Sequence, residues 1–197
     1  MDKNQVYIEE LKIEEVPWNR ITTAYGRATD FPQYFAIMWE MKSVTTVKDA
    51  FYKIARDIEH QSTLWHSTAF ALIFLVKIFK SAVNEMEKNK VARFLVEQLL
   101  DFFAVIAECA ECSHDIEILE HEKPLPLFSN MLDEQYLWPE DDENDEDLWD
   151  EDVFPDDLCY SFYYYSYQTI MLCKESLEEL KDTDFSEKVE RLQGLLV

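Results

Sequence analysis

The sequence predicts an all-α protein, and three observations support that prediction. The chain has only two glycines in 197 residues, Gly26 and Gly194, whereas hairpin-rich β folds use glycine for positive φ angles. Apolar residues recur at alternating steps of three and four, which is the spacing of one helical face. They make up 48% of a chain long enough to bury a core, so we expect one folded domain over residues 1–197.

The first two predicted helices follow from their start signals and apolar faces. Residues 1–28 are expected to be irregular or short-helical, and Asp30 with Pro32 then marks a helix that runs to about Met41. The second helix runs from about Val44 to Glu59. Its apolar positions share one face: Val44, Val47, Phe51, Ile54 and Ile58.

The next two predicted helices form the second pair. The helix from Thr63 to about Ser81 is apolar nearly all round, which predicts the central buried helix. The fourth runs from about Lys90 to Cys112, and residues 113–126 either extend it or form a short helix of their own. Helix pairs of about 40 residues within 15–112 predict antiparallel stacking as a short HEAT-like α-solenoid.

The second half of the chain is less regular. Residues 127–155 are expected to form a long connection, and residues 156–197 a C-terminal helix pair. The first helix of that pair runs from near Asp156 to about Lys181, with acidic residues at its start that suit the helix dipole. The second runs from Asp184, its predicted cap, to about Leu195.

The strongest charge feature is residues 140–157, which we call the acidic segment. It contains twelve carboxylates in eighteen residues, and no Lys or Arg occurs between Lys123 and Lys174. The whole chain carries a net charge of −23, and this much like charge repels itself and costs stability. The acidic segment therefore serves solubility or binds a basic partner.

Composition also excludes several classes of function. Phosphate binding needs clustered Lys and Arg, so nucleic acid is not an expected ligand, and an anionic membrane would repel the chain. Two glycines cannot build a P-loop or a dinucleotide-binding loop. The N-terminus lacks a secretory signal, and the longest apolar run, Ala69 to Val76, is too short to span a bilayer. We therefore expect a cytoplasmic protein with reduced cysteines.

Two motifs in the first half are distinctive. The first is Val16-Pro17-Trp18, followed by Ala24-Tyr25-Gly26-Arg27-Ala28 and Asp30-Phe31-Pro32. The second is Leu64-Trp65-His66-Ser67-Thr68-Ala69, followed by Ile73-Phe74-Leu75. Over about residues 15–110 these resemble the motifs of bacterial HEAT-like helical-repeat proteins, many of them immunity proteins of polymorphic toxin systems. The chain departs from the second motif at Ile73, where a proline is expected, and lacks the Gln-Gly that often follows the histidine.

The resemblance implies a non-enzymatic helical solenoid that binds a toxin domain. It also implies that Trp18, Tyr25, Gly26 and His66 are architectural, with Gly26 supplying a turn of positive φ. Residues 113–197, which include the acidic segment, lie outside the resemblance. The identity of the toxin does not follow from it.

One cluster has the residue types of a zinc site: Cys109, Cys112, His114 and His121. The segment continues a helical pattern without a glycine or proline to shape a knuckle, so cysteines buried as small apolar residues are the preferred interpretation. Glu111 and His114 have the spacing of a di-iron ligand pair. The nearest second pair, ending at His60, has Asp57 in place of glutamate, which weakens that interpretation.

Two further chemistries have partial signatures in the sequence. Asp141, Asp145 and Asp147 could form a calcium loop, but the glycine and the spaced glutamate of an EF-hand are missing. Cysteine–histidine catalysis stays open, because the two side chains need meet only in space. We expect no metal and no cofactor, assign no catalytic residue, and keep an α-helical metalloenzyme as the third alternative.

The aromatic-rich run that follows the acidic segment holds more rings than one helical face can bury. Tyr163 and Tyr167 fit the core stripe, whereas Tyr160, Tyr164 and Tyr165 are expected to lie elsewhere. Tyrosine is favoured at protein interfaces because it offers a large area at little entropic cost. Packing against the acidic connection or a neighbouring helix is the alternative.

These observations favour an immunity-type inhibitor that binds a basic toxin domain, such as a nuclease, and occludes its active site. The alternative is a helical scaffold or adaptor for a basic protein without any toxin. The oligomeric state stays open. The predicted partner-binding residues are Asp141, Asp142, Glu143, Asp145, Glu146, Asp147, Trp149, Asp150, Tyr160 and Tyr164.

Overall fold

The structure is a computed structural model that describes residues 3–112, 125–141, 143, 145 and 156–196. It is mostly helical, which confirms the predicted all-α class. The α-helices are α1 (Lys3–Glu10), α2 (Phe31–Glu40), α3 (Val44–Ile58), α4 (His66–Glu85), α5 (Lys90–Cys112), α7 (Asp156–Ile170), α8 (Lys174–Leu180) and α9 (Ser186–Leu195). The described 3₁₀ turns are η1 (Ile13–Glu15), η2 (Trp18–Arg20), η5 (Phe128–Leu132), η6 (Glu134–Tyr136) and η7 (Met171–Cys173).

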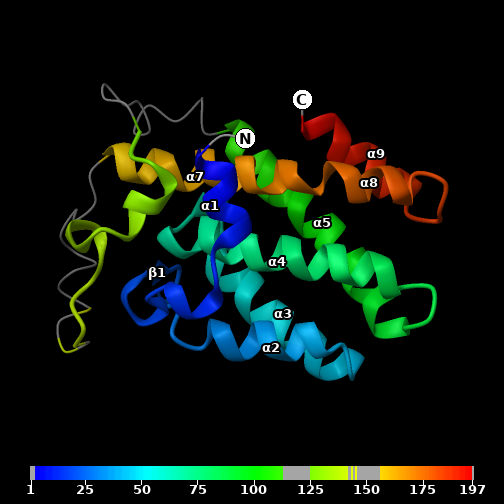
Figure 1. The fold of residues 1–197 in the computed structure, drawn as a ribbon, viewed down its shortest axis with the longest axis horizontal. Coiled ribbons are helices and arrows are strands. Elements are labelled where there is room, and N and C mark those ends of the chain that lie inside the picture. Colours follow the sequence, from blue (N-terminus) through cyan, green and yellow to red (C-terminus); the bar gives the residue numbers. More distant parts are fainter. Residues whose placement is uncertain (1–2, 113–124, 142, 144, 146–155, 197) are drawn as a thin grey trace.

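The described helices form three layers (Figure 1). The α2–α3 pair packs on the α4–α5 pair, and the layer of α7, α8 and α9 covers the other side. Within this stack α2 contacts α4 and α4 contacts α7, while α3 contacts α5 and α5 contacts α9. Helix α1 crosses the direction of α7 and contacts η5. The middle layer is therefore covered on both faces, which suits α4, a helix that is apolar nearly all round.

Helix α4 is the buried centre, as predicted. Of the described helices it alone is long and apolar enough to cross a membrane by length and composition, yet 83% of its apolar window is buried inside the molecule. A core helix of a water-exposed domain passes the same test, so packing against α2, α5 and α7 accounts for this composition.

The start of α4 differs from the prediction. The helix begins at His66 rather than Thr63, and it ends at Glu85 rather than near Ser81. Residues Thr63–Leu64 form β4, which pairs with β3 (Glu59–His60) in a two-residue hairpin. The turn between them has positive φ at both Gln61 and Ser62, and such a turn suits a short hairpin rather than a helix start.

A second hairpin orders the N-terminal motif. Strand β1 (Thr22–Thr23) pairs with β2 (Gly26–Arg27), and Gly26 has φ of +127°, which confirms the expected positive-φ turn. The ring of Trp18 is buried against three phenylalanines, Phe31, Phe35 and Phe74. Its Nε1 donates a hydrogen bond of 2.7 Å to the Ile13 carbonyl, so Trp18 ties the N-terminal loop to α2 and α4.

The predicted faces of α3 and α5 are the buried ones. On α3, Val47, Phe51, Ile54 and Ile58 are buried, and Val44 is half-buried against the core. The apolar stripe of α5 is likewise buried, from Val91 to Ile106. The 3–4 spacing in the sequence therefore identified both core-facing surfaces.

Two expectations for the C-terminal helix pair are wrong. The helix predicted from Asp156 to about Lys181 is interrupted by the 3₁₀ turn η7, and α8 continues from it. The last helix begins at Ser186, and Asp184 is not its cap because its carboxylate forms an ion pair with Arg93 of α5. A tertiary partner thus replaces the local capping bond.

Candidate functional site

Arg27, at the end of the β1–β2 hairpin, binds the first residues of the acidic segment and the proline before them. Its guanidinium donates hydrogen bonds to the carbonyls of Asn19 and Pro139, both at 2.6 Å, and to the carbonyl of Asp141 at 2.8 Å. It also forms a bidentate ion pair with the carboxylate of Asp145. The Arg27 side chain is only 9% exposed, so this anchor is largely shielded from water.

Arg20 binds residues that lie shortly before the acidic segment. Its Nε donates to the Trp138 carbonyl at 2.6 Å, and its two terminal nitrogens bind both carboxylate oxygens of Glu134. The hydrogen bond from Arg20 lowers the pKa of Glu134 and raises the pKa of the arginine itself. The backbone N–H of Trp138 in turn donates to the Arg20 carbonyl at 2.9 Å, and the Arg27 guanidinium lies over the indole of Trp138. The two arginines therefore join residues 134–141 and Asp145 to the N-terminal loop.

The structure assigns different positions to the predicted acidic residues. Asp141 and Glu143 are exposed, as is the neighbouring Glu140. Asp145 is bound by Arg27, so its charge is balanced within the molecule. Five predicted residues lie outside the described part of the chain: Asp142, Glu146, Asp147, Trp149 and Asp150.

The tyrosines of α7 are divided between core and surface. Tyr164 is 41% exposed, while Tyr160 is half-buried and packs against the core. The expectation that Tyr165 lies off the core is wrong, since it is 3% exposed. Its ring stacks on Phe128 at 4.5 Å, and its hydroxyl donates to the Pro126 carbonyl at 2.6 Å. Helix α7 therefore has a second buried face, which is covered by η5.

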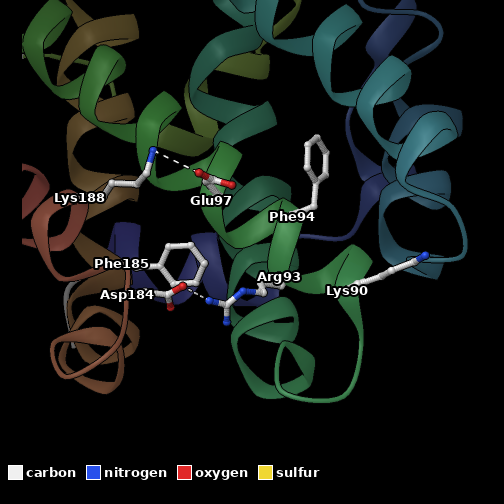
Figure 2. A pocket seen from close by; sticks show the side chains of 7 residues that line it. All are labelled: Lys90, Arg93, Phe94, Glu97, Asp184, Phe185 and Lys188. Carbon is white, nitrogen blue, oxygen red and sulfur yellow. Dashed lines mark hydrogen bonds and ion pairs between the residues drawn. The ribbon is translucent and has the colours of Figure 1, made fainter.

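A pocket of about 310 Å³ lies between α5 and α9 (Figure 2). Two of its cations are already paired: Arg93 with Asp184, and Lys188 with Asp101 at 2.6 Å and Glu97 at 3.7 Å. Arg93 also lies over the ring of Phe185, with its guanidinium carbon 4.9 Å from the ring centre. These contacts tie α9 to α5, and we interpret this pocket as structural.

The metal interpretations gain no support from the described residues, in which no group of three or more His, Cys, Asp and Glu is placed to hold a metal ion. Of the zinc candidates, Cys109 is buried, while His114 and His121 lie outside the described residues and nothing is described of the Cys112 side chain. In the di-iron alternative, His60 instead contacts the Tyr25 hydroxyl at 3.0 Å. Burial raises the pKa of the Cys173 thiol to about 12, which disfavours the thiolate that nucleophilic catalysis requires.

Sequence reasoning missed the two arginines. Arg20 and Arg27 flank the hairpin of the N-terminal motif, and they are two of only five arginines in the chain. The available signal was the lack of Lys or Arg near the acidic segment. Its carboxylates then need a cation from another part of the chain. Of the residues expected to be architectural, Trp18 and His66 are buried, whereas Tyr25 is 56% exposed and packs on His60 and Arg56 at the surface.

His66 connects three elements near this site. It starts α4, its Nε2 donates to the Met131 carbonyl of η5 at 2.8 Å, and its ring stacks on Phe162 of α7. Complete burial lowers the pKa of His66 to about 4, despite the opposing effect of that hydrogen bond. The imidazole is therefore neutral in the folded protein near pH 7.

His66 is expected to make stability depend on pH. The unfolded chain binds a proton at this histidine below about pH 6.5, whereas the folded protein does not until about pH 4. Stability should therefore fall on acidification from pH 6.5 towards 5, by up to about 1.4 kcal/mol per pH unit. Measured by urea unfolding, the stability of His66→Gln should depend less steeply on pH than the stability of the wild type. Phe162→Leu, which disturbs the same contact without removing the imidazole, should keep the wild-type slope. Equal slopes in all three proteins would contradict the assignment.

The fold and the site together define an all-α protein whose acidic segment is anchored at its start by two arginines. Comparison of the chain with family models, curated proteins and solved structures finds no significant match. Its function is therefore inferred from charge and geometry, together with the resemblance of the N-terminal motifs.

Proposed function

We propose that this protein is a cytoplasmic, non-enzymatic immunity-type inhibitor that binds a basic toxin domain, such as a nuclease, and occludes its active site. The observation that carries the proposal is the anchored acidic segment. Arg27 and Arg20 hold its start against the folded body, while the side chains of Glu140, Asp141 and Glu143 face solvent. A ligand for this surface has to be cationic.

Exposed charge of this kind acts mainly on the rate of association with a partner. Complementary potentials raise association rates by about 10- to 1,000-fold at low salt, and rim charges contribute less to the lifetime of a complex. Screening at physiological salt leaves charges effective only within about 8 Å, so the anchored carboxylates matter most at close range. A basic active-site cleft is a suitable partner because carboxylates can occupy the positions that phosphates would take.

The arrangement of helices is compatible with the HEAT-like part of the proposal. Helices α2, α4 and α7 follow one another across the layers, and so do α3, α5 and α9. Such stacking of helix pairs is the arrangement that a short solenoid has. We propose that the three layers form such a solenoid, with the acidic segment inserted before its last layer.

A scaffold or adaptor role is the second candidate, and one observation favours it. Three exposed aromatic side chains lie on the N-terminal part of the molecule: Tyr25 at 56%, Trp39 at 54% and Tyr52 at 68% exposure. Exposed aromatics of this size are enriched at protein interfaces, so a second partner could bind there. A neighbouring gene for a large secreted protein with a variable C-terminal domain would favour the inhibitor over the adaptor.

The proposal predicts a specific kinetic effect of charge. The partner is first captured with the full chain and identified by mass spectrometry. Neutralising Asp141, Asp142, Glu143, Glu146 and Asp147 to Asn or Gln should then slow association about tenfold or more at low salt and flatten its salt dependence. Asp145 is kept because it binds Arg27. Dissociation should change less. Stopped-flow kinetics at two salt concentrations measures both rates.

The control changes net charge equally at other exposed positions. The control positions are all exposed and lie outside the acidic segment: Glu9, Glu10, Glu85 and Glu179 are on helices, and Glu87 is in the turn between α4 and α5. Their replacement by Gln should slow association less than the first variant does. Equal slowing by both variants would assign the effect to net charge alone, and an unchanged rate in the first variant would show that the acidic segment serves solubility.

A further inference from the structure

A groove between α1 and α7 is unlike the rest of this surface. It encloses about 170 Å³ and is lined by Asn4, Gln5, Ile8, Tyr164, Tyr165, Gln168, Met171 and Leu172. None of these side chains is charged, although 30% of the chain is. Its lining also includes none of the described carboxylates of the acidic segment.

One wall of the groove is held rigidly. The side-chain oxygen of Asn4 accepts a hydrogen bond from the Phe128 N–H at 3.2 Å, and its nitrogen donates to the Tyr165 hydroxyl at 3.4 Å. That hydroxyl donates in turn to the Pro126 carbonyl, and the Tyr165 ring is stacked on Phe128. A wall fixed in this way loses little conformational entropy when a ligand binds.

The other lining residues offer different contacts. Tyr164 and Gln168 are exposed one turn apart on α7, and the Tyr164 ring meets Tyr165 edge-on. The floor is formed by Ile8, which is buried, and by Met171 and Leu172, which are half-buried. The groove thus combines an apolar floor with amide groups that can both donate to and accept from a peptide backbone.

These features define the chemistry of the ligand. A cavity of about 150 Å³ lined by apolar side chains holds a benzene ring, so a groove of this volume admits one large side chain. An ammonium or guanidinium group placed here would lose water and meet no carboxylate in the lining, so the groove disfavours it. The fitting group is an uncharged aromatic or large aliphatic side chain on a peptide backbone.

The groove also lies close to the end of the acidic segment. Helix α7 begins at Asp156, and Tyr164 follows eight residues later, about 12 Å along the helix axis. A partner bound at the acidic segment could therefore contact the groove at the same time.

We propose that this groove receives one aromatic or large aliphatic anchor side chain of the basic partner. This inference rests on the proposed function and deepens it, because it separates two tasks. The acidic segment attracts the partner, and the groove retains it. Anchors that fill a pocket carry most of the binding energy of an interface and determine its dissociation rate.

The chemistry of the groove can be tested before any partner is known. N-acetyl-phenylalanine amide is titrated into the full chain, and the side-chain amide signals of Asn4, Gln5 and Gln168 are followed by NMR. We expect saturable shifts that the N-acetyl amides of lysine and glutamate do not produce. Tyr164→Ala should weaken binding about fivefold, the loss expected for one aromatic contact. Gln33→Ala, an exposed change on α2, should not weaken it.

The outcomes separate this inference from the proposed function. Absence of saturable shifts, equal shifts with the charged probes, or equal binding by Tyr164→Ala and the wild type would each overturn the groove assignment. The identified partner gives a second readout, because Tyr164→Ala should speed its dissociation about fivefold with little change in association. Neutralisation of the acidic segment tests the proposed function independently of either result.

Discussion

Replacement of Phe128 by alanine is expected to lower the free energy of unfolding by about 3–5 kcal/mol, the usual cost of truncating a fully buried phenylalanine. Phe128 is 0% exposed although it lies in the connection between α5 and α7. Its ring packs on Tyr165 at 4.5 Å, on Phe70 at 5.0 Å and on Tyr7 at 5.7 Å. The variant would therefore open a cavity where α1, α4 and α7 meet.

Urea unfolding of the two proteins measures the effect. Leu127→Ala is the matched control, because Leu127 is the preceding residue and is 48% exposed. Its replacement should change stability by about 0.5 kcal/mol or less. A similarly small loss in Phe128→Ala would show that η5 does not belong to the core.

Arg27→Ala is expected to have the second largest effect, a loss of about 3 kcal/mol, which is typical of removing one partner from a buried ion pair. The change leaves the carboxylate of Asp145 unpaired. It also removes the donor to the carbonyls of Asn19, Pro139 and Asp141. The carboxylate of Asp145 contributes most of the loss, because its bonds to Arg27 are part-buried, whereas the three carbonyls are exposed and can bind water instead.

Three comparisons test this interpretation. Arg27→Lys keeps the charge but not the fork of donors, so it should recover only part of the loss. The double change Arg27→Ala with Asp145→Asn should be more stable than Arg27→Ala alone, because no carboxylate is then left unpaired. Arg56→Ala, whose side chain is 53% exposed, should cost about 1 kcal/mol or less. Equal losses in Arg27→Ala and Arg56→Ala would show that Arg27 is not an anchor.

The elements that sequence reasoning predicted correctly depend on local information. Helices α3 and α5 begin within a residue of their predicted starts, because the 3–4 apolar spacing repeats over several turns. The buried position of α4 follows from its composition, since a helix that is apolar all round has to be covered on all sides. The positive φ of Gly26 follows from the properties of glycine in a tight turn.

The errors occur where a distant group competes with a local signal. Asp184 has the residue type of a helix cap, but Arg93 of α5 binds its carboxylate. Tyr165 lies off the expected stripe of α7, yet η5 supplies Phe128 as a stacking partner. Neither competing partner is close in the sequence, so periodicity and capping rules could not reveal it.

By itself, the sequence determined the helical class, the buried faces of α3 and α5, the central position of α4 and the acidic character. Each of these depends on residue types or on spacing along one stretch of chain. The tertiary structure alone decided that Arg20 and Arg27 hold the start of the acidic segment, and that α1 and α7 enclose an uncharged groove. Both features join residues more than a hundred positions apart, and such pairings follow from the packing of the layers rather than from any local preference.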